Sequence, residues 1–188
     1  MAEPLQIRPL TPERWDDLVT LFGPRGAVAG CWCMWWRQTA REFEQNAGEA
    51  NREALRALVD SGRVPGLLAY HDGRAVGWVS VAPRGEFGRL ERSPTLGRVD
   101  ETPVWSVVCF YVARDERRGG VGSALLRAAA DHVSTHGGRC VEGYPVDVGD
   151  GRSRAGDIFT GVLSTFLEAG FQEVARRSPK RPIVRLDL

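Results

Sequence analysis

The residues best suited to chemistry form a glycine- and arginine-rich run at 117–123, Arg-Arg-Gly-Gly-Val-Gly-Ser. The run follows an apolar, β-prone stretch at 104–112 and opens a stretch at about 120–135 whose apolar residues recur at helical spacing. The first turn of a helix carries unpaired N–H groups and about half a positive charge. Glycines leave that backbone open to an anion, and the two arginines add charge. The run therefore predicts a phosphate or pyrophosphate site.

Two other phosphate-binding patterns do not describe this run. The Gly-Lys-Ser/Thr end of a P-loop is missing, and so is the third glycine of the dinucleotide fingerprint. A glycine cluster by itself is better explained by a tight turn. The interpretation therefore depends on the elements around the run.

Those elements predict a mixed α/β domain. Apolar stretches bounded by turn residues indicate strands, and Asp72-Gly73 between two of them is a strong hairpin signal. We expect one domain over residues 1–188, with a central, largely antiparallel sheet of about seven strands flanked by helices. The expected strands are 5–8, 65–70, 75–81, 104–112, 139–144, 171–177 and 183–188; the expected helices are 11–23, 49–59, 120–135 and 157–170, with a long loop at 82–103.

Residues 112–126, Val-Ala-Arg-Asp-Glu-Arg-Arg-Gly-Gly-Val-Gly-Ser-Ala-Leu-Leu, resemble the acyl-coenzyme A (acyl-CoA) signature of the GNAT superfamily of N-acyltransferases. That signature is Arg or Gln, two residues, Gly, one residue, then Gly or Ala, and it lies between a strand and a helix. The order of elements along most of the chain extends the resemblance. So does the segment Phe-Leu-Glu-Ala-Gly-Phe at 166–171, which is similar to the family's late helix.

The resemblance implies a reaction and a site. The reaction is direct transfer of an acyl group, expected to be acetyl, from acyl-CoA to a primary amine of a small-molecule acceptor in a ternary complex, without a metal. The central strand at 104–112 would splay from the strand at 139–144. The thioester would lie in that gap, and the amine would enter from the other side. The implied cofactor-binding residues are Phe110 and Val112, whose backbone would pair with the pantetheine arm, and Arg117, Arg118, Gly119, Gly120, Val121, Gly122 and Ser123, which would wrap the pyrophosphate.

The chain departs from the family where many members carry Asn and Tyr on the late helix. Phe159 and Phe166 stand at these positions, and neither can donate a proton to the leaving thiolate. A coenzyme A thiol should resemble cysteine, with a pKa of about 8.5, so its thiolate leaves readily without an acid. Tyr144 and Tyr111 are possible donors, although a packed aromatic ring with a satisfied hydroxyl explains each of them better.

A general base matters more, because an alkylamine with a pKa of about 10.4 is almost wholly protonated at neutral pH. Glu142 is the first candidate, since its strand should border the gap where amine and thioester meet. A strand-end carboxylate paired with arginine is an equally good interpretation of this residue. Asp100 and Glu101, just before the central strand, are second candidates, and Asp147 is a third.

Trp32, Trp35 and Trp36 lie between the first two expected helices, where this family often forms its acceptor pocket. We expect them to form an aromatic wall of that pocket, with core packing or a homodimer contact as the alternatives. Arg84, in the long loop, would help to close the pocket. Cys31 and Cys33 are near neighbours, but the other two cysteines, Cys109 and Cys140, are isolated in apolar strands, so no metal site is expected.

The composition argues against several other classes of function and location. The formal net charge is +1 without a basic block, which argues against nucleic-acid binding as the main function. No apolar run approaches the ~20 residues of a membrane span, and the first residues do not form a signal peptide. We therefore expect no membrane partner and a cytoplasmic location, where cysteines stay reduced. The rival function is a non-catalytic acyl-CoA-binding regulatory module, which the missing tyrosine slightly favours.

Overall fold

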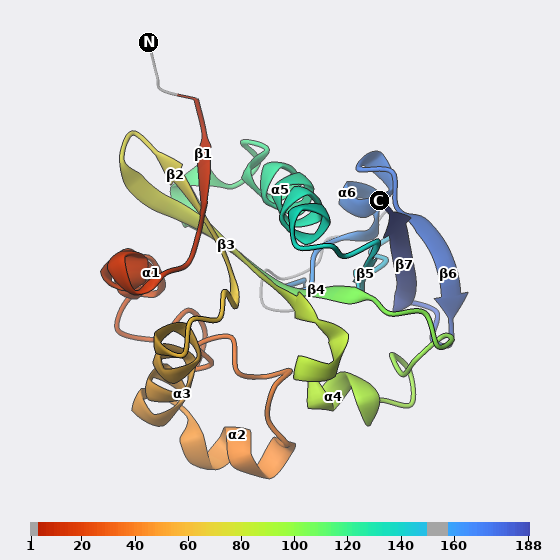
Figure 1. Ribbon diagram of the computed structural model, residues 1–188, viewed down its shortest axis with the longest axis horizontal. Coiled ribbons are helices and arrows are strands. Elements are labelled where there is room, and N and C mark those ends of the chain that lie inside the picture. Colours follow the sequence, from red (N-terminus) through yellow and green to blue (C-terminus); the bar gives the residue numbers. More distant parts are fainter. Residues whose placement is uncertain (1–3, 150–157) are drawn as a thin grey trace.

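The computed structural model describes residues 4–149 and 158–188. Within them, seven strands form one sheet in the order β1-β2-β3-β4-β5-β7-β6 (Figure 1). Neighbouring strands are antiparallel except β4 and β5, which run parallel. The predicted fold class is confirmed. The strands are β1 (Gln6–Pro9), β2 (Gly66–His71), β3 (Arg74–Pro83), β4 (Trp105–Val112), β5 (Cys140–Gly143), β6 (Gln172–Arg176) and β7 (Pro182–Asp187).

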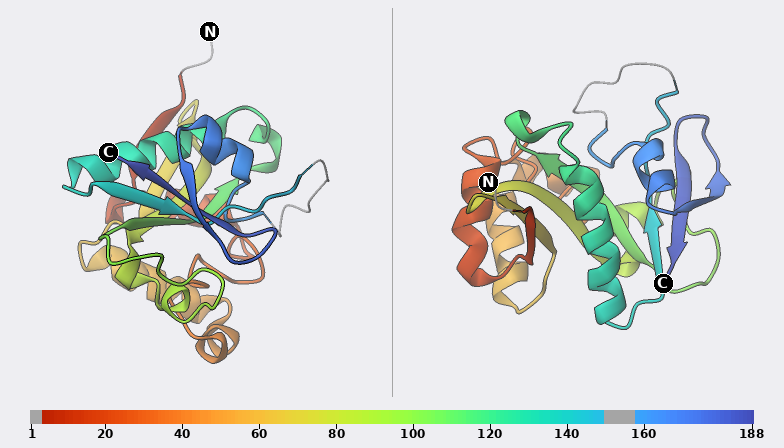
Figure 2. Two further views of the ribbon diagram at one scale, coloured as in Figure 1. Left: turned by 90° about the vertical axis from the view of Figure 1, so that its right-hand side faces the viewer. Right: turned by 90° about the horizontal axis from the view of Figure 1, so that it is seen from above.

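Helices cover both faces of the sheet (Figures 1 and 2). Side chains alternate along β2, so Leu67 and Ala69 join the core under α5, whereas Leu68 joins the core under α1 and α3. None of the helices in the described part of the chain is long and apolar enough to cross a bilayer. The helices are η1 (Pro12–Arg14), α1 (Trp15–Phe22), α2 (Ala40–Asn46), α3 (Glu49–Asp60), η2 (Arg84–Glu86), α4 (Gly88–Glu91), η3 (Arg114–Glu116), α5 (Val121–Thr135) and α6 (Leu163–Glu168).

The predicted Asp-Gly hairpin joins β2 to β3. Asp72 and Gly73 both have left-handed backbone, with φ of 48° and 74°. A two-residue turn of this hand matches the twist of the flanking strands. The prediction from the Asp-Gly pair is confirmed, because glycine adopts positive φ without strain and aspartate adopts it more readily than most residues.

Two predicted segments differ from the structure. The late helix was expected from Asp157, but α6 begins only at Leu163, and Asp157 itself lies outside the described residues. Gly161 has a φ of +88°, which no α-helix accommodates, so the apolar residues before it are not helical. The expected long loop at 82–103 instead contains the end of β3 and the short helices η2 and α4.

β4 and β5 separate soon after they pair. The register joins residues 105–107 of β4 to residues 141–143 of β5, and β4 then continues to Val112 without this neighbour. The ring of Phe166 packs on Gly143, where a Cβ would collide with it. The separation is the splay that the resemblance implied, and it leaves one edge of β4 available to other groups.

Candidate functional site

The glycine-rich run forms the turn that starts α5. Arg118 and Gly120 have left-handed backbone, with φ of 67° and 81°, and no described side chain caps the first turn of α5. A Cβ at Gly120 or Gly122 would meet no described atom within 4 Å. An uncapped helix N-terminus with open backbone and two exposed arginines, Arg117 and Arg118, can hold a pyrophosphate.

The acidic residues just before this turn are neutralised. Arg74 donates to Asp115 over 2.8 Å and to Glu116 over 3.0 Å, and a ring nitrogen of His71 lies 3.2 Å from Glu116. The hydrogen bond from Arg74 holds the pKa of Asp115 below its usual range. These pairs reduce the repulsion that an incoming anion would meet at α5.

The β4 edge beyond the splay is bonded within the chain. The Phe110 N–H donates to the Phe159 carbonyl over 2.6 Å, and the Val112 carbonyl accepts from Arg117 Nε over 3.1 Å. These two residues are the ones assigned to the pantetheine arm by resemblance. Pairing with that arm at the Phe110 N–H therefore requires its present bond to be exchanged, whereas the Val112 carbonyl can accept a second hydrogen bond.

A cavity of about 480 Å³ lies beside this edge. Its walls come from the end of β4, from the segment between α1 and α2, from the residues before α6 and from the glycine-rich turn through Arg117. Arg117 is the one residue of the run at 117–123 that lines it, and the size of the cavity suits a small molecule. The lining residues are Ala27, Val28, Ala29, Cys31, Cys33, Trp35, Trp36, Phe43, Cys109, Phe110, Tyr111, Val112, Arg117, Ile158 and Phe159.

Two of the three predicted tryptophans line this cavity. Trp36 is anchored by its indole N–H, which donates to the Val108 carbonyl of β4 over 3.0 Å. Trp35 is 38% exposed. The guanidinium carbon of Arg89 lies over its ring, 3.8 Å from the ring centroid. Trp32 is instead in the core, stacked on Trp15 with ring centroids 6.1 Å apart. Sequence spacing alone did not separate the core member from the two at the cavity.

Glu142 lies in a buried ion-pair network. Its Oε1 accepts from Arg84 over 2.7 Å and from the Tyr144 hydroxyl over 2.6 Å, and its Oε2 accepts from Arg185 over 2.8 Å. Ser106 also contacts the Tyr144 hydroxyl. Burial, followed by the charge of Glu142, raises the pKa of Tyr144 well above its usual value.

Glu142, Tyr144 and Arg84 do not border the cavity at the β4 edge. The geometry of Glu142 matches the alternative of a strand-end carboxylate paired with arginine. Arg84 is only 4% exposed, and it also donates to Glu91 and to the Leu96 carbonyl. It therefore ties the 82–103 segment to β5.

The other candidate bases are dispersed. Asp100 pairs with Arg185 over 2.7 Å, and that hydrogen bond lowers its pKa. Asp147 pairs with Arg176 over 2.7 Å, with the same effect on its pKa. Glu101 is exposed and lines a different hollow of about 700 Å³ at the start of β4. None of the three borders the cavity at the other end of β4.

Of the aromatic residues near the splay, Tyr111 and Phe159 line the cavity, whereas Phe166 is buried. Tyr111 lines the cavity and packs edge-on against Phe22, with ring centroids 5.5 Å apart. Phe159 also lines it and faces Trp36 across 6.2 Å. Phe166 is fully buried at the splay, so the ring at the family's tyrosine position fills the gap beside Gly143.

Three cysteines meet at the cavity, which the sequence did not indicate. Cys31, Cys33 and Cys109 all line it, and the Trp78 indole N–H donates to Cys33 Sγ over 2.9 Å. Burial raises the pKa of Cys31, and the hydrogen bond with Cys33 together with burial raises that of Cys109. The thiols of Cys31 and Cys109 are therefore neutral wall groups at physiological pH, and no metal-binding cluster occurs within residues 4–149 and 158–188.

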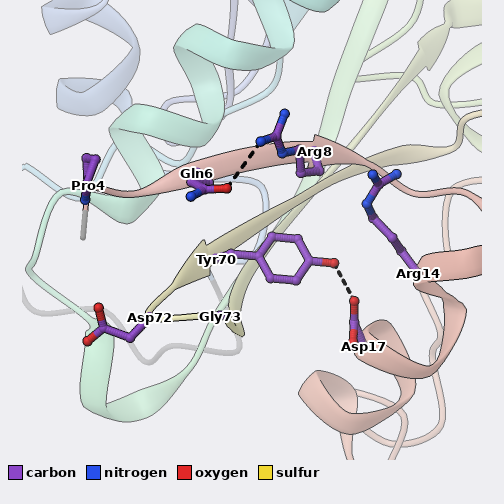
Figure 3. Close-up of a pocket in the computed structure, with 8 residues that line it drawn as sticks. All are labelled: Pro4, Gln6, Arg8, Arg14, Asp17, Tyr70, Asp72 and Gly73. Carbon is purple, nitrogen blue, oxygen red and sulfur yellow. Dashed lines mark hydrogen bonds between the residues drawn. The ribbon is translucent and has the colours of Figure 1, made fainter. Parts of the chain in front are cut away.

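A smaller hollow of about 210 Å³ lies near β1, β2 and α1 (Figure 3). The Tyr70 hydroxyl donates to Asp17 across it over 2.7 Å, and burial raises the pKa of that tyrosine. Arg8 and Arg14 also line it. It shares no lining residue with the cavity at the β4 edge.

Comparisons with known proteins place the chain in a family of acetyltransferases. Residues 29–153 match the model of the acetyltransferase (GNAT) family. A search of curated protein sequences finds no match. An agmatine N-acetyltransferase structure is similar, with a TM-score of 0.61 at 15% identity, covering 99% of this chain and 100% of that one.

Two further structures show the same fold. PaiA N-acetyltransferase from Thermoplasma acidophilum, solved with coenzyme A, has a TM-score of 0.57 at 14% identity over 99% of this chain and 100% of that one. A Drosophila melanogaster polyamine N-acetyltransferase has a TM-score of 0.58 at 15% identity over 98% and 100%. At such identities the likeness is one of fold.

Proposed function

The chain belongs to the acetyltransferase (GNAT) family, and from that premise we propose that it transfers an acyl group, in the first place acetyl, from acyl-CoA to a primary amine of a small molecule. One observation carries the proposal: Arg117, which lies just before the open N-terminus of α5, also lines the cavity beside the splayed β4 edge. One ligand can therefore place its pyrophosphate at the turn and its thioester in the cavity.

The turn provides the fit for the pyrophosphate. Gly120 and Gly122 have open space where a side chain would stand, and Arg117 and Arg118 are exposed beside them. We propose that residues 117–123 bind the two phosphates through backbone N–H groups and guanidinium charge. The Phe110 N–H would leave the Phe159 carbonyl and pair with the pantetheine arm, so one hydrogen bond replaces another at little net cost.

The chemistry needs little help from side chains once both substrates are aligned. The amine nitrogen attacks the thioester carbon, the new C–N bond forms, and the C–S bond breaks to release a thiolate. Since that thiol has a pKa of about 8.5, the thiolate leaves without a general acid. Positioning of the two reactants then supplies much of the rate. This is consistent with the phenylalanines Phe159 and Phe166 at the family's late-helix positions.

The ammonium proton must leave before the attack. Glu142 stays a proposed base only through a water relay, because its carboxylate does not border the cavity. Glu101 borders the hollow at the opposite end of β4. A primary amine as acceptor is in keeping with the fold neighbours named for agmatine and polyamine.

The test measures cofactor binding and turnover separately. Coenzyme A should raise the Tm of the wild type by mass action. Gly120→Glu should abolish this shift, because it places an anion at the turn. Gly62→Glu is the matched control, since Gly62 has a similar φ of 82° and equally open space at the end of α3. A Gly120→Glu variant that keeps the full shift would contradict the assignment of the turn.

Turnover distinguishes the enzyme from the binding module. The assay measures the thiol released from acetyl-CoA with a library of primary amines. We expect at least one amine to be acetylated, with loss of activity in Gly120→Glu and not in Gly62→Glu. Tight coenzyme A binding with no acetylated amine would favour the regulatory module.

A further inference from the structure

The walls of the cavity beside β4 are apolar apart from one cation. Among the described lining residues Arg117 is the only charged side chain, and none is a carboxylate. Two acidic residues that adjoin these walls are paired within the chain. Glu42 accepts from the Thr39 hydroxyl over 2.7 Å, and Glu86 accepts from Arg37 over 2.6 Å. The described lining residues therefore offer no anionic partner to a second cation.

The charge around the cavity is positive. Arg117 borders it at the turn, and the guanidinium of Arg89 lies 3.8 Å above the ring of Trp35. The Arg89 Nη2 is buried and has no hydrogen-bond partner in the described part of the chain. A ligand cation near Trp35 would meet repulsion from this guanidinium.

We propose that the acceptor is a primary amine whose remaining body is apolar or aromatic and carries no second positive charge. This inference rests on the proposed acyltransferase function. Burying an unpaired ammonium against apolar walls is strongly unfavourable, whereas burying an alkyl or aryl body is favourable. The volume of about 480 Å³ accommodates such a body in addition to the thioester.

The walls divide between the two substrates. Phe110, Val112 and Arg117 border the β4 edge and the turn, where the cofactor arm is placed. Val28, Trp35 and other residues from the segment between α1 and α2 form the wall that this assignment leaves to the acceptor. The apolar body of the amine would contact this wall, with Trp35 as an exposed aromatic platform.

The same walls would prepare the nucleophile. Desolvation and nearby guanidinium charge both disfavour an ammonium, so the pKa of a bound amine falls below its value in water. The amine would lose its proton to solvent on entering and attack in the neutral form. No carboxylate is then required at the reacting atoms, in agreement with the described lining residues.

The experiment compares hexylamine with 1,6-diaminohexane, which adds a second ammonium at the far end of the same six-carbon chain. With acetyl-CoA at saturation, we expect kcat/KM for hexylamine to exceed that for the diamine at least about 100-fold, equal to about 2.8 kcal/mol at 1.4 kcal/mol per tenfold. Equal use of the two amines, or preference for the diamine, would overturn the acceptor class and leave the acyltransferase function intact.

A carboxylate introduced at the wall should change this preference. Val28→Glu adds one at a 57% exposed lining residue, and we expect it to reduce the hexylamine preference by about tenfold or more. Val174→Glu is the matched control, a 40% exposed valine on β6 that does not line the cavity. Identical preferences in the two variants would show that the wall does not contact the acceptor, which contradicts the inference.

Two further measurements separate the inference from its premise. Calorimetric titration of the coenzyme A complex should show tighter binding of hexylamine than of the diamine, even if neither is acetylated. If hexylamine binds more tightly but neither amine is acetylated, the proposed transfer activity fails and the proposed amine selectivity of the cavity stands. Equal binding of the two amines, or no binding of either, overturns the proposed selectivity. Faster transfer from octanoyl-CoA to methylamine than from acetyl-CoA to hexylamine would assign the apolar wall to the acyl chain and overturn the inference.

Discussion

Glu142→Gln tests whether the buried carboxylate is a base or a structural partner. Glutamine keeps the volume and can still accept the hydrogen bond from Tyr144, but it removes the ion pairs with Arg84 and Arg185. Breaking a buried pair typically costs about 3–5 kcal/mol. Each arginine keeps a second acidic partner, Glu91 or Asp100, so we expect about 3 kcal/mol.

This loss should lower the Tm by about 6–12 °C, at about 2–4 °C per kcal/mol for a chain of this size. Calorimetry gives the Tm, and kcat/KM is measured from pH 6 to pH 10. If the carboxylate is structural, activity follows the folded fraction and the deficit is the same at every pH. Glu91→Gln is the control: it removes pairs to the same Arg84 and to the exposed Arg98 from a carboxylate that is 33% exposed, and should cost about 0–1 kcal/mol.

The opposite result would refute this reasoning. A Glu142→Gln variant with the wild-type Tm, but with kcat/KM lowered about 10²–10⁴-fold near neutral pH, would behave as an enzyme without its general base. Its deficit would shrink as the pH approaches the pKa of the amine, because free amine then becomes abundant. That profile would make Glu142 the base through a water relay.

Three further predictions concern the splay and the end of α5. Gly143→Ala should lower the Tm by several degrees, because the new methyl group collides with Phe166 and overpacking costs about 1–3 kcal/mol; an unchanged Tm by calorimetry would contradict this contact. Phe166→Tyr should leave kcat within a few-fold of the wild type while lowering the Tm, since its hydroxyl enters a fully buried site; a tenfold gain in kcat would mean that a general acid was missing. Burial, with His136 second, lowers the pKa of His132, so the unfolded chain binds its proton more readily and stability falls below about pH 6.5. His132→Gln should therefore lose less Tm than the wild type between pH 7.5 and pH 5, and equal losses in a melting series would count against it.

Much of the architecture follows from local patterns. The Asp-Gly turn, the unalternating strand at 104–112 and the glycine-arginine run each depend on neighbours in the chain, and each is found where the pattern indicates. The same patterns led to the GNAT resemblance, and the family match agrees with it. The early start predicted for the late helix was wrong. The apolar spacing before Leu163 is typical of a helix, but Gly161 adopts a positive φ that a helix does not accommodate.

The tertiary structure decided which chemically capable residues share a site. Local periodicity carries no information about contacts between distant segments, so the sequence could not show that Arg84 and Arg185 enclose Glu142, or that Trp32 packs in the core while Trp35 and Trp36 reach the cavity. The bond from Phe110 to Phe159 likewise joins residues 49 positions apart, and only the fold brings them together. The sequence by itself determined most of the elements, the glycine-arginine turn at the start of α5 and the family. The proposed acceptor wall depends on long-range packing, because burial and electrostatic pairing are properties of the folded chain.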